Sequence, residues 1–185
     1  MKPTVLAVVG TRPDAIKMAP VVRELKKREE INCRVISSGQ HSEMLDTVLT
    51  ERGIVPDISL RVMSEGQSLA ALTERLFVAF CSALEKERAD LVAVHGDTTT
   101  ALVAALVAFY HGIPVAHVEA GLRSDNIREP FPEELDRRFI SLVASIHFAP
   151  TGIARRALIG EGVDKRRIFV TGNTVTDALD LTSTL

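Results

Sequence analysis

The sequence predicts an α/β domain, doubly wound around a mostly parallel, Rossmann-like sheet. Short apolar runs rich in β-branched residues, such as residues 4–9, are typical of strands buried on both faces of a parallel sheet. Each run is followed by a longer segment whose apolar residues recur at helical spacing. This alternation continues along the whole chain without an internal repeat, and it favours right-handed crossovers between parallel strands.

The first half of the chain carries three strand–helix units. Helical spacing is clear after the first strand, where Ile16, Ala19 and Val22 recur and a basic turn ends the segment. Ser42 is a suitable cap for the second helix, and Gly53 can end that helix. We therefore expect strands at residues 4–9, 33–37 and 58–62, and helices at residues 13–28, 42–52 and 68–87.

The second half continues the pattern with four more strands. Gly112 and Pro114 mark a turn before one of them, and the polar residues 123–132 are typical of a loop. The last helix reaches Leu185 without a terminal glycine, which fits a domain boundary as well as a gene-encoded end. We expect strands at residues 91–94, 115–118, 146–148 and 168–170, and helices at residues 98–110, 133–145, 154–159 and from Thr174 onward.

Length and composition indicate one globular domain. The chain has 185 residues, of which 46% are hydrophobic and 25% charged. A net charge of −2 leaves no basic surplus for a nucleic-acid backbone. Two cysteines without a CxxC pattern argue against a disulfide framework and a zinc cluster. The N-terminal apolar run is too short for a transmembrane helix, so we expect a cytoplasmic protein that binds neither nucleic acid nor membrane.

Residues 10–14 (GTRPD) join the first strand to the first helix, at the sheet edge where open α/β sheets bind ligands. Pro13 suits the first helical position, so the helix N-terminus faces this edge and favours an anion. Arg12 adds a positive charge there, and Lys17 lies one turn further on. The segment matches neither GxGxxG nor a Walker A loop, and a diphosphate pocket and an ordinary strand–helix junction are equally compatible with it.

Two further strands end in an acid that follows a histidine two positions earlier. Asp97 follows His95, and Glu119 follows His117. Asp97 is also a suitable helix cap, as is Thr98, and position alone slightly favours a capping role for Asp97. The two His-x-acid pairs permit a shared metal site. Histidines at strand ends are more often packed or supporting residues, and we expect no metal.

The fourth polar segment, residues 128–138, is denser in charge than one helix cap requires. Pro132 can open a helix with Glu133 and Glu134 in its first turn, where acids complement the helix dipole. Arg137 lies one turn after Glu133 and can pair with it or hold a ligand anion. Together with the two strand-end acids, this segment indicates acid–base chemistry beside a phosphate leaving group.

Read together, these segments resemble the bacterial non-hydrolysing UDP-N-acetylglucosamine 2-epimerases. They occur in the family's order along nearly the whole chain, which makes the resemblance highly specific. The matching stretches are GTRPDAIKMAPVV (residues 10–22), SGQHSEML (38–45), HGDTTTALVAALVAFYHGIPVAHVEAGLRS (95–124), PFPEELDRR (130–138), HFAPT (147–151) and VTGNTVTDAL (170–179).

The resemblance implies a glycosyltransferase-B-type fold with the active site in a cleft between two domains. Residues 1–185 look like the N-terminal domain, with the C-terminal UDP-binding domain absent from this chain. The resemblance also implies UDP-N-acetylglucosamine as ligand, no cofactor, a homodimer in the full-length protein and a role in cell-envelope polysaccharide biosynthesis. It implies catalytic importance for Asp97, Glu119 and Glu133, and substrate contacts for Arg12, Lys17, Asp97, Glu119 and Arg137.

Some positions bear on a second, regulatory site. Gln40 and His41 match a region that, in some members of the family, helps to bind a second UDP-sugar. Glu43 and Gly66 differ from the polar residues expected in that region, so we do not expect a full regulatory site.

Asp14 stands where the family usually has Glu, a change that conserves charge.

The implied reaction is reversible epimerisation at C2 of UDP-N-acetylglucosamine. Loss of UDP from C1 acidifies the C2 proton, and a carboxylate base completes elimination to 2-acetamidoglucal. Protonation from the other face and return of UDP give UDP-N-acetylmannosamine, and the face served by each carboxylate stays open. We expect the chain to be inactive alone. The alternatives are a hydrolysing 2-epimerase, which releases UDP and N-acetylmannosamine, and a non-catalytic nucleotide-sugar-binding domain.

Overall fold

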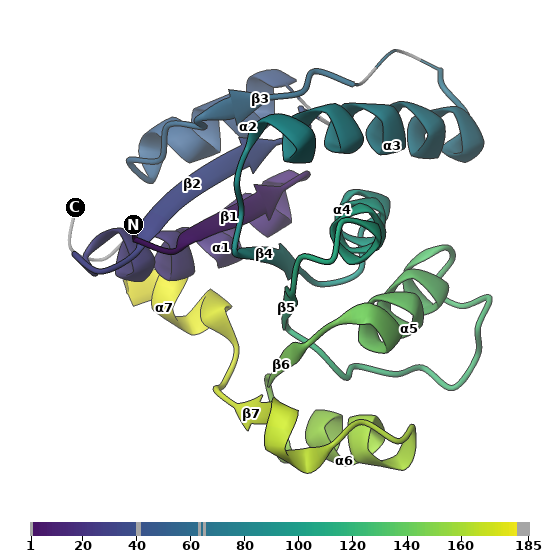
Figure 1. Cartoon of the computed structure of the whole chain (residues 1–185). Coiled ribbons are helices and arrows are strands. Elements are labelled where there is room, and N and C mark those ends of the chain that lie inside the picture. Colours follow the sequence, from purple (N-terminus) through teal and green to yellow (C-terminus); the bar gives the residue numbers. More distant parts are fainter. Residues whose placement is uncertain (1, 40–41, 63, 65, 181–185) are drawn as a thin grey trace.

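The computed structural model of the chain contains a seven-stranded sheet in the order β3-β2-β1-β4-β5-β6-β7 (Figure 1). It describes the backbone of residues 2–39, 42–62, 64 and 66–180, and the side chains of all these except residues 42–46 and 180. The strands are β1 (Thr4–Val9), β2 (Asn32–Ser37), β3 (Ile58–Ser59), β4 (Leu91–His95), β5 (Val115–Val118), β6 (Ile146–Ala149) and β7 (Ile168–Val170). The helices are α1 (Arg12–Lys26), α2 (Ser42–Glu51), α3 (Leu69–Lys86), α4 (Thr99–Tyr110), α5 (Glu133–Val143), α6 (Gly152–Gly160), the 3-10 helix η1 (Lys165–Arg167) and α7 (Thr174–Asp180).

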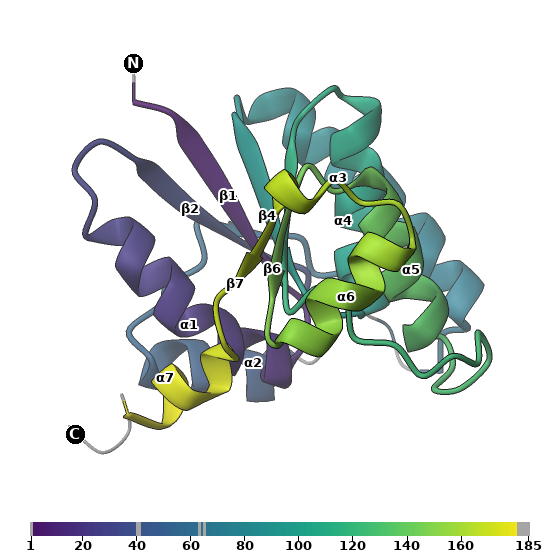
Figure 2. The ribbon, with the colours of Figure 1, turned by 90° about the horizontal axis from the view of Figure 1, so that it is seen from below.

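Every strand pair in the sheet is parallel, and helices cover both faces. Figure 2 shows α1, α2 and α7 on one side of the sheet and α3 to α6 on the other. The chain begins in the middle with β1, adds β2 and β3 outward, and returns to place β4 on the other side of β1. The predicted doubly wound α/β fold is confirmed, and the reversal between β1 and β4 is where such sheets bind ligands.

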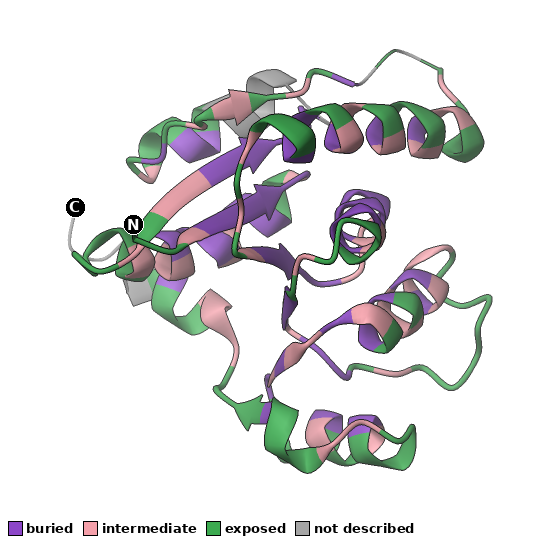
Figure 3. Cartoon of the chain, viewed as in Figure 1, coloured by how far each residue is buried: buried purple, intermediate pink, exposed green. Residues whose placement is uncertain are grey.

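The two larger apolar clusters lie one on each face of the sheet, and a smaller third cluster packs α6 against β6 and β7. Figure 3 shows the central strands β1 and β4 buried along most of their length. In β1, Leu6 and Val8 share a cluster with residues of α3 and α4, whereas Val5 and Ala7 share one with residues of α1 and α2. Successive side chains of a strand point to opposite faces, so a strand buried on both sides must be apolar throughout. This requirement explains why the continuous apolar runs of the sequence mark the strands.

The strand boundaries follow local backbone geometry as well as the apolar pattern. β1, β5 and β7 begin and end where predicted. The strand expected at residues 58–62 ends at Ser59, because Arg61 has a φ of +49°, outside the extended region. Gly53 ends α2 as predicted, with a φ of +66°. The expected cap at Ser42 lies outside the described side chains.

α1 begins one residue earlier than expected, at Arg12, which places Pro13 in the second helical position. The Thr11 hydroxyl accepts the Asp14 N–H at 3.4 Å, and the Asp14 carboxylate accepts the Thr11 N–H at 3.1 Å. This reciprocal pair is a capping box, which satisfies two N–H groups at the helix start. The predicted strand–turn–helix junction is therefore present. Its capping box leaves fewer backbone N–H groups free than an uncapped helix N-terminus would have.

Within the part of the chain that the structure describes, no helix combines the length and the apolar character needed to cross a bilayer. Cys33 on β2 and Cys81 on α3 are both free thiols. Burial raises the pKa of the Cys33 thiol, so this cysteine is mainly a packing residue.

The turn after β5 requires glycine at position 121. Gly121 has a φ of +89°, and a Cβ at this position would lie 2.4 Å from the carbonyl oxygen of Ala154 in α6. Gly162 has nearly the same φ, +91°, but no atom lies within 4 Å of the place where its Cβ would be. A side chain at either position would strain the backbone, but only a side chain at position 121 would also clash with a neighbour.

We expect Gly121→Ala to destabilise the chain more than Gly162→Ala. Both substitutions place a side chain in the left-handed region, at a cost of about 1–2 kcal/mol. Gly121→Ala must also displace α6, which adds about 1–3 kcal/mol. Urea unfolding followed by circular dichroism measures both losses. Equal losses would show that α6 withdraws from position 121 without cost.

Candidate functional site

The carboxyl ends of β4 and β5 bring two acids to one edge of the sheet. His95 pairs with Val118, and the Gly96 N–H donates to the Val118 carbonyl oxygen at 2.9 Å. The pairing therefore holds to the last residue of both strands. Glu119 follows β5 directly and Asp97 follows β4 after Gly96, so the two acids stand at the ends of neighbouring strands.

Glu119 is held by both its backbone and its carboxylate. Its φ is +63°, a conformation that is uncommon outside glycine and that marks strained, often functional positions. Each carboxylate oxygen accepts from Lys17 Nζ at 2.8 Å, and Oε2 also accepts from Asn173 Nδ2 at 2.9 Å. The Asn173 amide oxygen accepts the Val175 N–H of α7 at 3.0 Å. Glu119 thus joins α1, the end of β5 and the start of α7.

His95 lies between Glu119 and a second buried carboxylate. Its Nδ1 atom is 3.2 Å from Asp14 Oδ1, and its Nε2 atom is 3.8 Å from Glu119 Oε2. Asp14 also accepts the Thr98 hydroxyl at 3.3 Å. The sequence singled out His95 only as half of a metal pair and Asp14 only as a family departure. Neither residue was among the expected site residues. The sequence does not show toward which face of the sheet the side chain of a residue at a strand end points.

Asp97 forms an ion pair with Arg137 of α5, with 2.6 Å between Oδ2 and the guanidinium. Thr98 caps α4, because its hydroxyl accepts a first-turn backbone N–H at 3.2 Å. The capping role that position alone favours for Asp97 is therefore wrong. Burial raises the pKa of Asp97, Arg137 opposes this, and the nearby charges of Glu133 and Glu119 raise the pKa further.

Arg137 makes its ion pairs with acids other than Glu133. Its guanidinium pairs with Asp97, and its Nε lies 3.6 Å from Glu134 Oε2 and donates to the backbone carbonyl of Glu133 at 3.3 Å. The Glu133 carboxylate keeps one buried oxygen, Oε2, that has no hydrogen-bond partner among the residues described. A buried acceptor without a donor costs free energy. It is therefore a natural contact point for a donor on a ligand.

Glu134 explains much of the charge density around α5. Its fully buried carboxylate accepts Arg138 Nε at 2.7 Å and the Ser124 N–H at 3.0 Å. Burial raises the pKa of Glu134, but these two donors outweigh it and hold the pKa below its usual range. Arg123 and Glu161 extend the network with an ion pair of 2.6 Å. This part of the segment anchors the polar loop to α5 and α6.

Asp136 is a buried acid that the sequence analysis did not single out. It lies on the inner face of α5, where its Oδ2 accepts the Thr99 hydroxyl at 3.2 Å. Burial raises the pKa of Asp136 to about 7; the Thr99 hydrogen bond opposes this, and Glu133 and Asp97 add to it. Its position three residues after Glu133, on the same helix face, was the available signal.

The remaining expected residues fall outside these contacts. Arg12 is exposed at the start of α1, and among the described residues no ion pair or hydrogen bond involves its side chain. The capping box already uses the N–H groups of Thr11 and Asp14, which leaves the Arg12 guanidinium as an exposed positive charge at this helix start. Gln40 and His41, the candidate regulatory residues, lie outside the described residues.

The two His-x-acid pairs do not converge on one ion. His95 points toward Asp14 on α1, whereas His117 lies opposite Val94 and so faces the cluster beneath α4. His117 donates from Nε2 to the Gly96 carbonyl oxygen at 2.7 Å, and burial lowers its pKa to about 3. In the described part of the chain, no group of three or more His, Cys, Asp or Glu residues could hold a metal ion.

The site therefore consists of two acidic groups that flank the ends of β4 and β5. Glu119 with Lys17 lies toward α1, and Asp97 with Arg137 and Glu133 lies toward α5. The pKa of Asp97 responds to acids of both groups, so the two are electrostatically coupled. Carboxylates kept in different charge environments at one edge suit proton transfer at two faces of a ligand.

Comparison with known proteins identifies relatives of the whole described domain. A family model described as "UDP-N-acetylglucosamine 2-epimerase" matches residues 23–185. The chain is 51% identical over 178 residues to the UDP-N-acetylglucosamine 2-epimerase of Bacillus subtilis (strain 168), covering 96% of this chain and 47% of the relative. The chain thus spans about half the length of the curated relatives it matches.

Solved structures show the same relation. The crystal structure of UDP-GlcNAc 2-epimerase from Neisseria meningitidis bound to UDP-GlcNAc has a TM-score of 0.94 and 46% identity, covering 98% of this chain and 50% of that chain. A lipopolysaccharide outer core galactosyltransferase in its apo form is 14% identical with a TM-score of 0.64, over 92% of this chain and 45% of that chain, and shares the fold alone. These matches agree with the glycosyltransferase-B-type fold that the sequence motifs imply.

Asp136→Asn should stabilise the chain near and above neutral pH. An unfolded Asp has a pKa of about 3.9, whereas the pKa of folded Asp136 is about 7. Between these values the folded chain holds the extra proton, so the free energy of unfolding falls as pH rises from about 4 to about 7. Above that range Asn removes the cost of a buried charge, and we expect a gain of about 2–4 kcal/mol. Chemical denaturation across this pH range measures the gain.

The matched control is Asp125→Asn, because the Asp125 side chain is 96% exposed. His117 and His147 are buried with pKa values lowered to about 3 and about 4, so every variant loses stability as pH falls below about 6.5. The difference between two stability curves isolates the substituted acid. A curve for Asp136→Asn that runs parallel to that of the unchanged chain would contradict the assignment.

Proposed function

The chain belongs to the UDP-N-acetylglucosamine 2-epimerase family, and on that premise we propose that it provides the acid–base half of an enzyme that interconverts UDP-N-acetylglucosamine and UDP-N-acetylmannosamine. The observation that carries the proposal is the pair Asp97 and Glu119, each held by a cation at neighbouring strand ends. The Neisseria meningitidis relative is described as bound to UDP-GlcNAc. We extend that ligand to the present chain.

The reaction needs a base, an acid and a stabilised leaving group. The C2 proton of the sugar is not beside a carbonyl, so it becomes acidic only as UDP leaves C1. A carboxylate then takes the C2 proton, the C1–O bond breaks, and a C1=C2 double bond forms in 2-acetamidoglucal. Protonation at C2 from the opposite face, with return of UDP to C1, gives the epimer. Two carboxylate groups on either side of the ring meet this requirement.

The roles follow from the contacts of each side chain. Arg12 carries an unpaired guanidinium at the start of α1, and we assign it to the leaving diphosphate. Lys17 contacts both oxygens of Glu119, and Arg137 pairs with Asp97, so the two cations hold these carboxylates in place. The unpartnered oxygen of Glu133 is positioned to accept a donor from the sugar. The face of the ring served by each acid is left unassigned.

The proposed reaction needs a second half of the cleft opposite the acids of this domain. We propose that residues 1–185 are the N-terminal domain, and that a UDP-binding C-terminal domain closes the site in the complete enzyme. The support is that the chain spans about half the length of its relatives. An open half-site leaves water around the carboxylates, which weakens every electrostatic contribution to catalysis. The cytoplasmic location stays a prediction from the sequence.

The reconstituted enzyme should depend on all three acids. The chain alone should show no epimerisation in a coupled assay for UDP-N-acetylmannosamine. Activity should appear when it is mixed with the part of the Bacillus subtilis relative that it does not match. In that mixture, Asp97→Asn, Glu119→Gln and Glu133→Gln should each lower kcat by at least about a hundredfold, the usual size of a general acid–base contribution.

The matched control is Glu30→Gln, because Glu30 is exposed before the amino end of β2, at the opposite edge of the sheet. This variant should keep full activity. Near-normal kcat in all three site variants, with folding intact, would remove the carboxylate assignment. Accumulation of free UDP would indicate the hydrolysing reaction, and binding of UDP-N-acetylglucosamine without turnover would indicate a binding domain.

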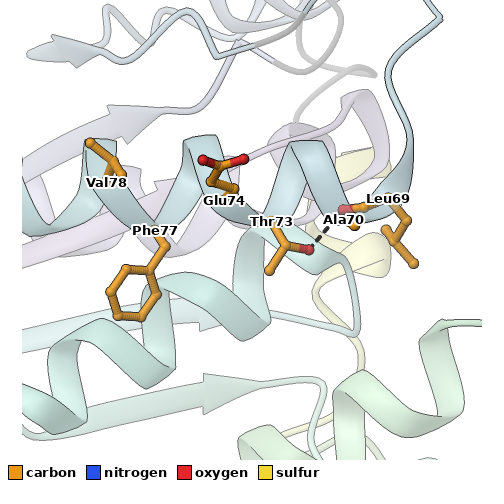
Figure 4. A pocket seen from close by; sticks show the side chains of 6 residues that line it. All are labelled: Leu69, Ala70, Thr73, Glu74, Phe77 and Val78. Atoms are coloured by element: carbon orange, nitrogen blue, oxygen red, sulfur yellow. Dashed lines mark hydrogen bonds between the residues drawn. The ribbon is translucent and has the colours of Figure 1, made fainter.

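A face formed by α3 and α4 suits a second copy of the chain. A hollow of about 760 Å³ is lined by Leu69, Ala70, Thr73, Glu74, Phe77 and Val78 (Figure 4). The rings of Phe77 and Tyr110 meet edge-on at 6.2 Å and join the two helices. Val78, Phe109 and Tyr110 are each more than half exposed. Apolar, aromatic surface with few charges is typical of homodimer cores, and we propose that this face forms the homodimer.

Val78→Glu should shift the chain toward the monomer, because it places a charge in the middle of the proposed interface. Sedimentation equilibrium across a wide range of protein concentrations measures the shift. Val55→Glu is the control, since Val55 is 76% exposed and lies outside α3 and α4. A chain that is monomeric at every concentration, or an equal effect of both variants, would count against this interface.

A further inference from the structure

His95 ends β4 with its imidazole enclosed between two carboxylates. The side chain is only 4% exposed, and those of Asp14 and Glu119 are 6% and 11% exposed. One ring nitrogen faces each acid, Nδ1 toward Asp14 at 3.2 Å and Nε2 toward Glu119 at 3.8 Å. The order carboxylate–imidazole–carboxylate runs from α1, through the end of β4, to the end of β5.

The contacts of Asp14 determine which ring nitrogen of His95 carries the hydrogen. The Asp14 carboxylate already accepts the Thr11 N–H at 3.1 Å and the Thr98 hydroxyl at 3.3 Å. An ionised carboxylate only accepts hydrogen bonds, so the His95 nitrogen that faces it has to donate. Nδ1 therefore holds the hydrogen, and Nε2 of the neutral ring has a free lone pair.

The Nε2 atom is buried and has no hydrogen-bond partner among the described residues. It faces Glu119 Oε2, which also has lone pairs and already accepts from Lys17 and Asn173. Two acceptors that face each other make no hydrogen bond. A proton placed on either of them would create one once the atoms approach to about 2.7–3.2 Å. The geometry thus provides a place for one proton.

We propose that His95, oriented by Asp14, takes the proton that Glu119 removes from the sugar. In this step the O–H bond of protonated Glu119 breaks and an N–H bond forms at His95 Nε2. The imidazolium lies against the Asp14 carboxylate, which balances its charge, and Glu119 returns to the ionised form that Lys17 holds. In the opposite direction of the reversible reaction, where Glu119 delivers a proton to C2, the N–H bond at His95 Nε2 breaks and Glu119 is protonated again. The role of Glu119 rests on the proposed function, whereas the tautomer of His95 does not.

Nitrogen-15 NMR of the 185-residue chain tests the orientation step directly. In neutral His95, Nδ1 should be protonated and Nε2 unprotonated. Asp14→Asn should convert the ring to the Nε2–H form, because an Asn amide can donate to Nδ1, and the same change at the carboxylate of a catalytic triad inverts the tautomer. Asp14→Glu should restore the original form, since it returns a carboxylate.

The His95 resonances are identified by their loss in His95→Gln. His111 is an internal control, because its Nδ1 lies 2.9 Å from the Val107 carbonyl oxygen and is independent of Asp14. Well-dispersed amide spectra show which variants remain folded. An Nε2–H tautomer in the unchanged chain, or an unchanged tautomer in folded Asp14→Asn, would overturn the orientation by Asp14.

The proton-holding step is tested in the reconstituted enzyme. His95→Gln and Asp14→Asn should each lower kcat by about tenfold or more with little change in KM, and Asp14→Glu should recover most of the loss. An unchanged kcat in His95→Gln would overturn the step. If the unchanged reconstituted enzyme itself shows no turnover while the tautomer is as expected, the proposed function fails and the Asp14–His95 arrangement stands.

Discussion

The register between β4 and β5 is the constraint on which the candidate site depends. Val94 pairs with His117 and His95 with Val118, and the pairing continues through the N–H of Gly96. Because side chains alternate between faces, a shift of one residue would turn His95 away from Asp14 and toward the other cluster. The shift would also exchange Val92 and Val94, which pack in one cluster, with Ala93, which packs in the other, and close packing opposes such a change of volume. Core packing therefore aligns the acids.

Much of the fold is readable from the sequence because a parallel sheet with helices on both faces needs uninterrupted apolar strands. β1, β5 and β7 were predicted to the residue, and the caps Ser68 and Thr98 stand where α3 and α4 begin. The elements that the sequence analysis predicted wrongly or omitted are short, and they depend on local backbone geometry. β3 stops early at a positive φ near Arg61, and η1 is too short to carry a periodic pattern. Neither depends on hydrophobicity.

The site was predictable in its location and only partly in its contacts. Asp97 and Glu119 were expected at the sheet edge from their positions after strands, whereas the ion pair between Lys17 and Glu119 spans more than a hundred residues and has no local signal. Asp136 was missed because its burial depends on how α5 packs against α4. Helical spacing offered Arg137 either Glu133 or a ligand anion as its partner, and it gave no signal for Asp97, which lies about forty residues away in the sequence.

The Asn173 side chain makes two hydrogen bonds. Its amide Nδ2 donates to Glu119, and its amide oxygen accepts the Val175 N–H in the first turn of α7. α7 lies against α1 (Figure 1), and Arg52, just beyond α2, donates to the Ala178 carbonyl oxygen near its end at 2.6 Å. A rotation of α7 away from α1 would pull Asn173 off the carboxylate and leave Glu119 to Lys17 alone. The Glu119 carboxylate is thus mechanically linked to the docking of the last described helix, and any movement of that helix also changes which donors hold the carboxylate.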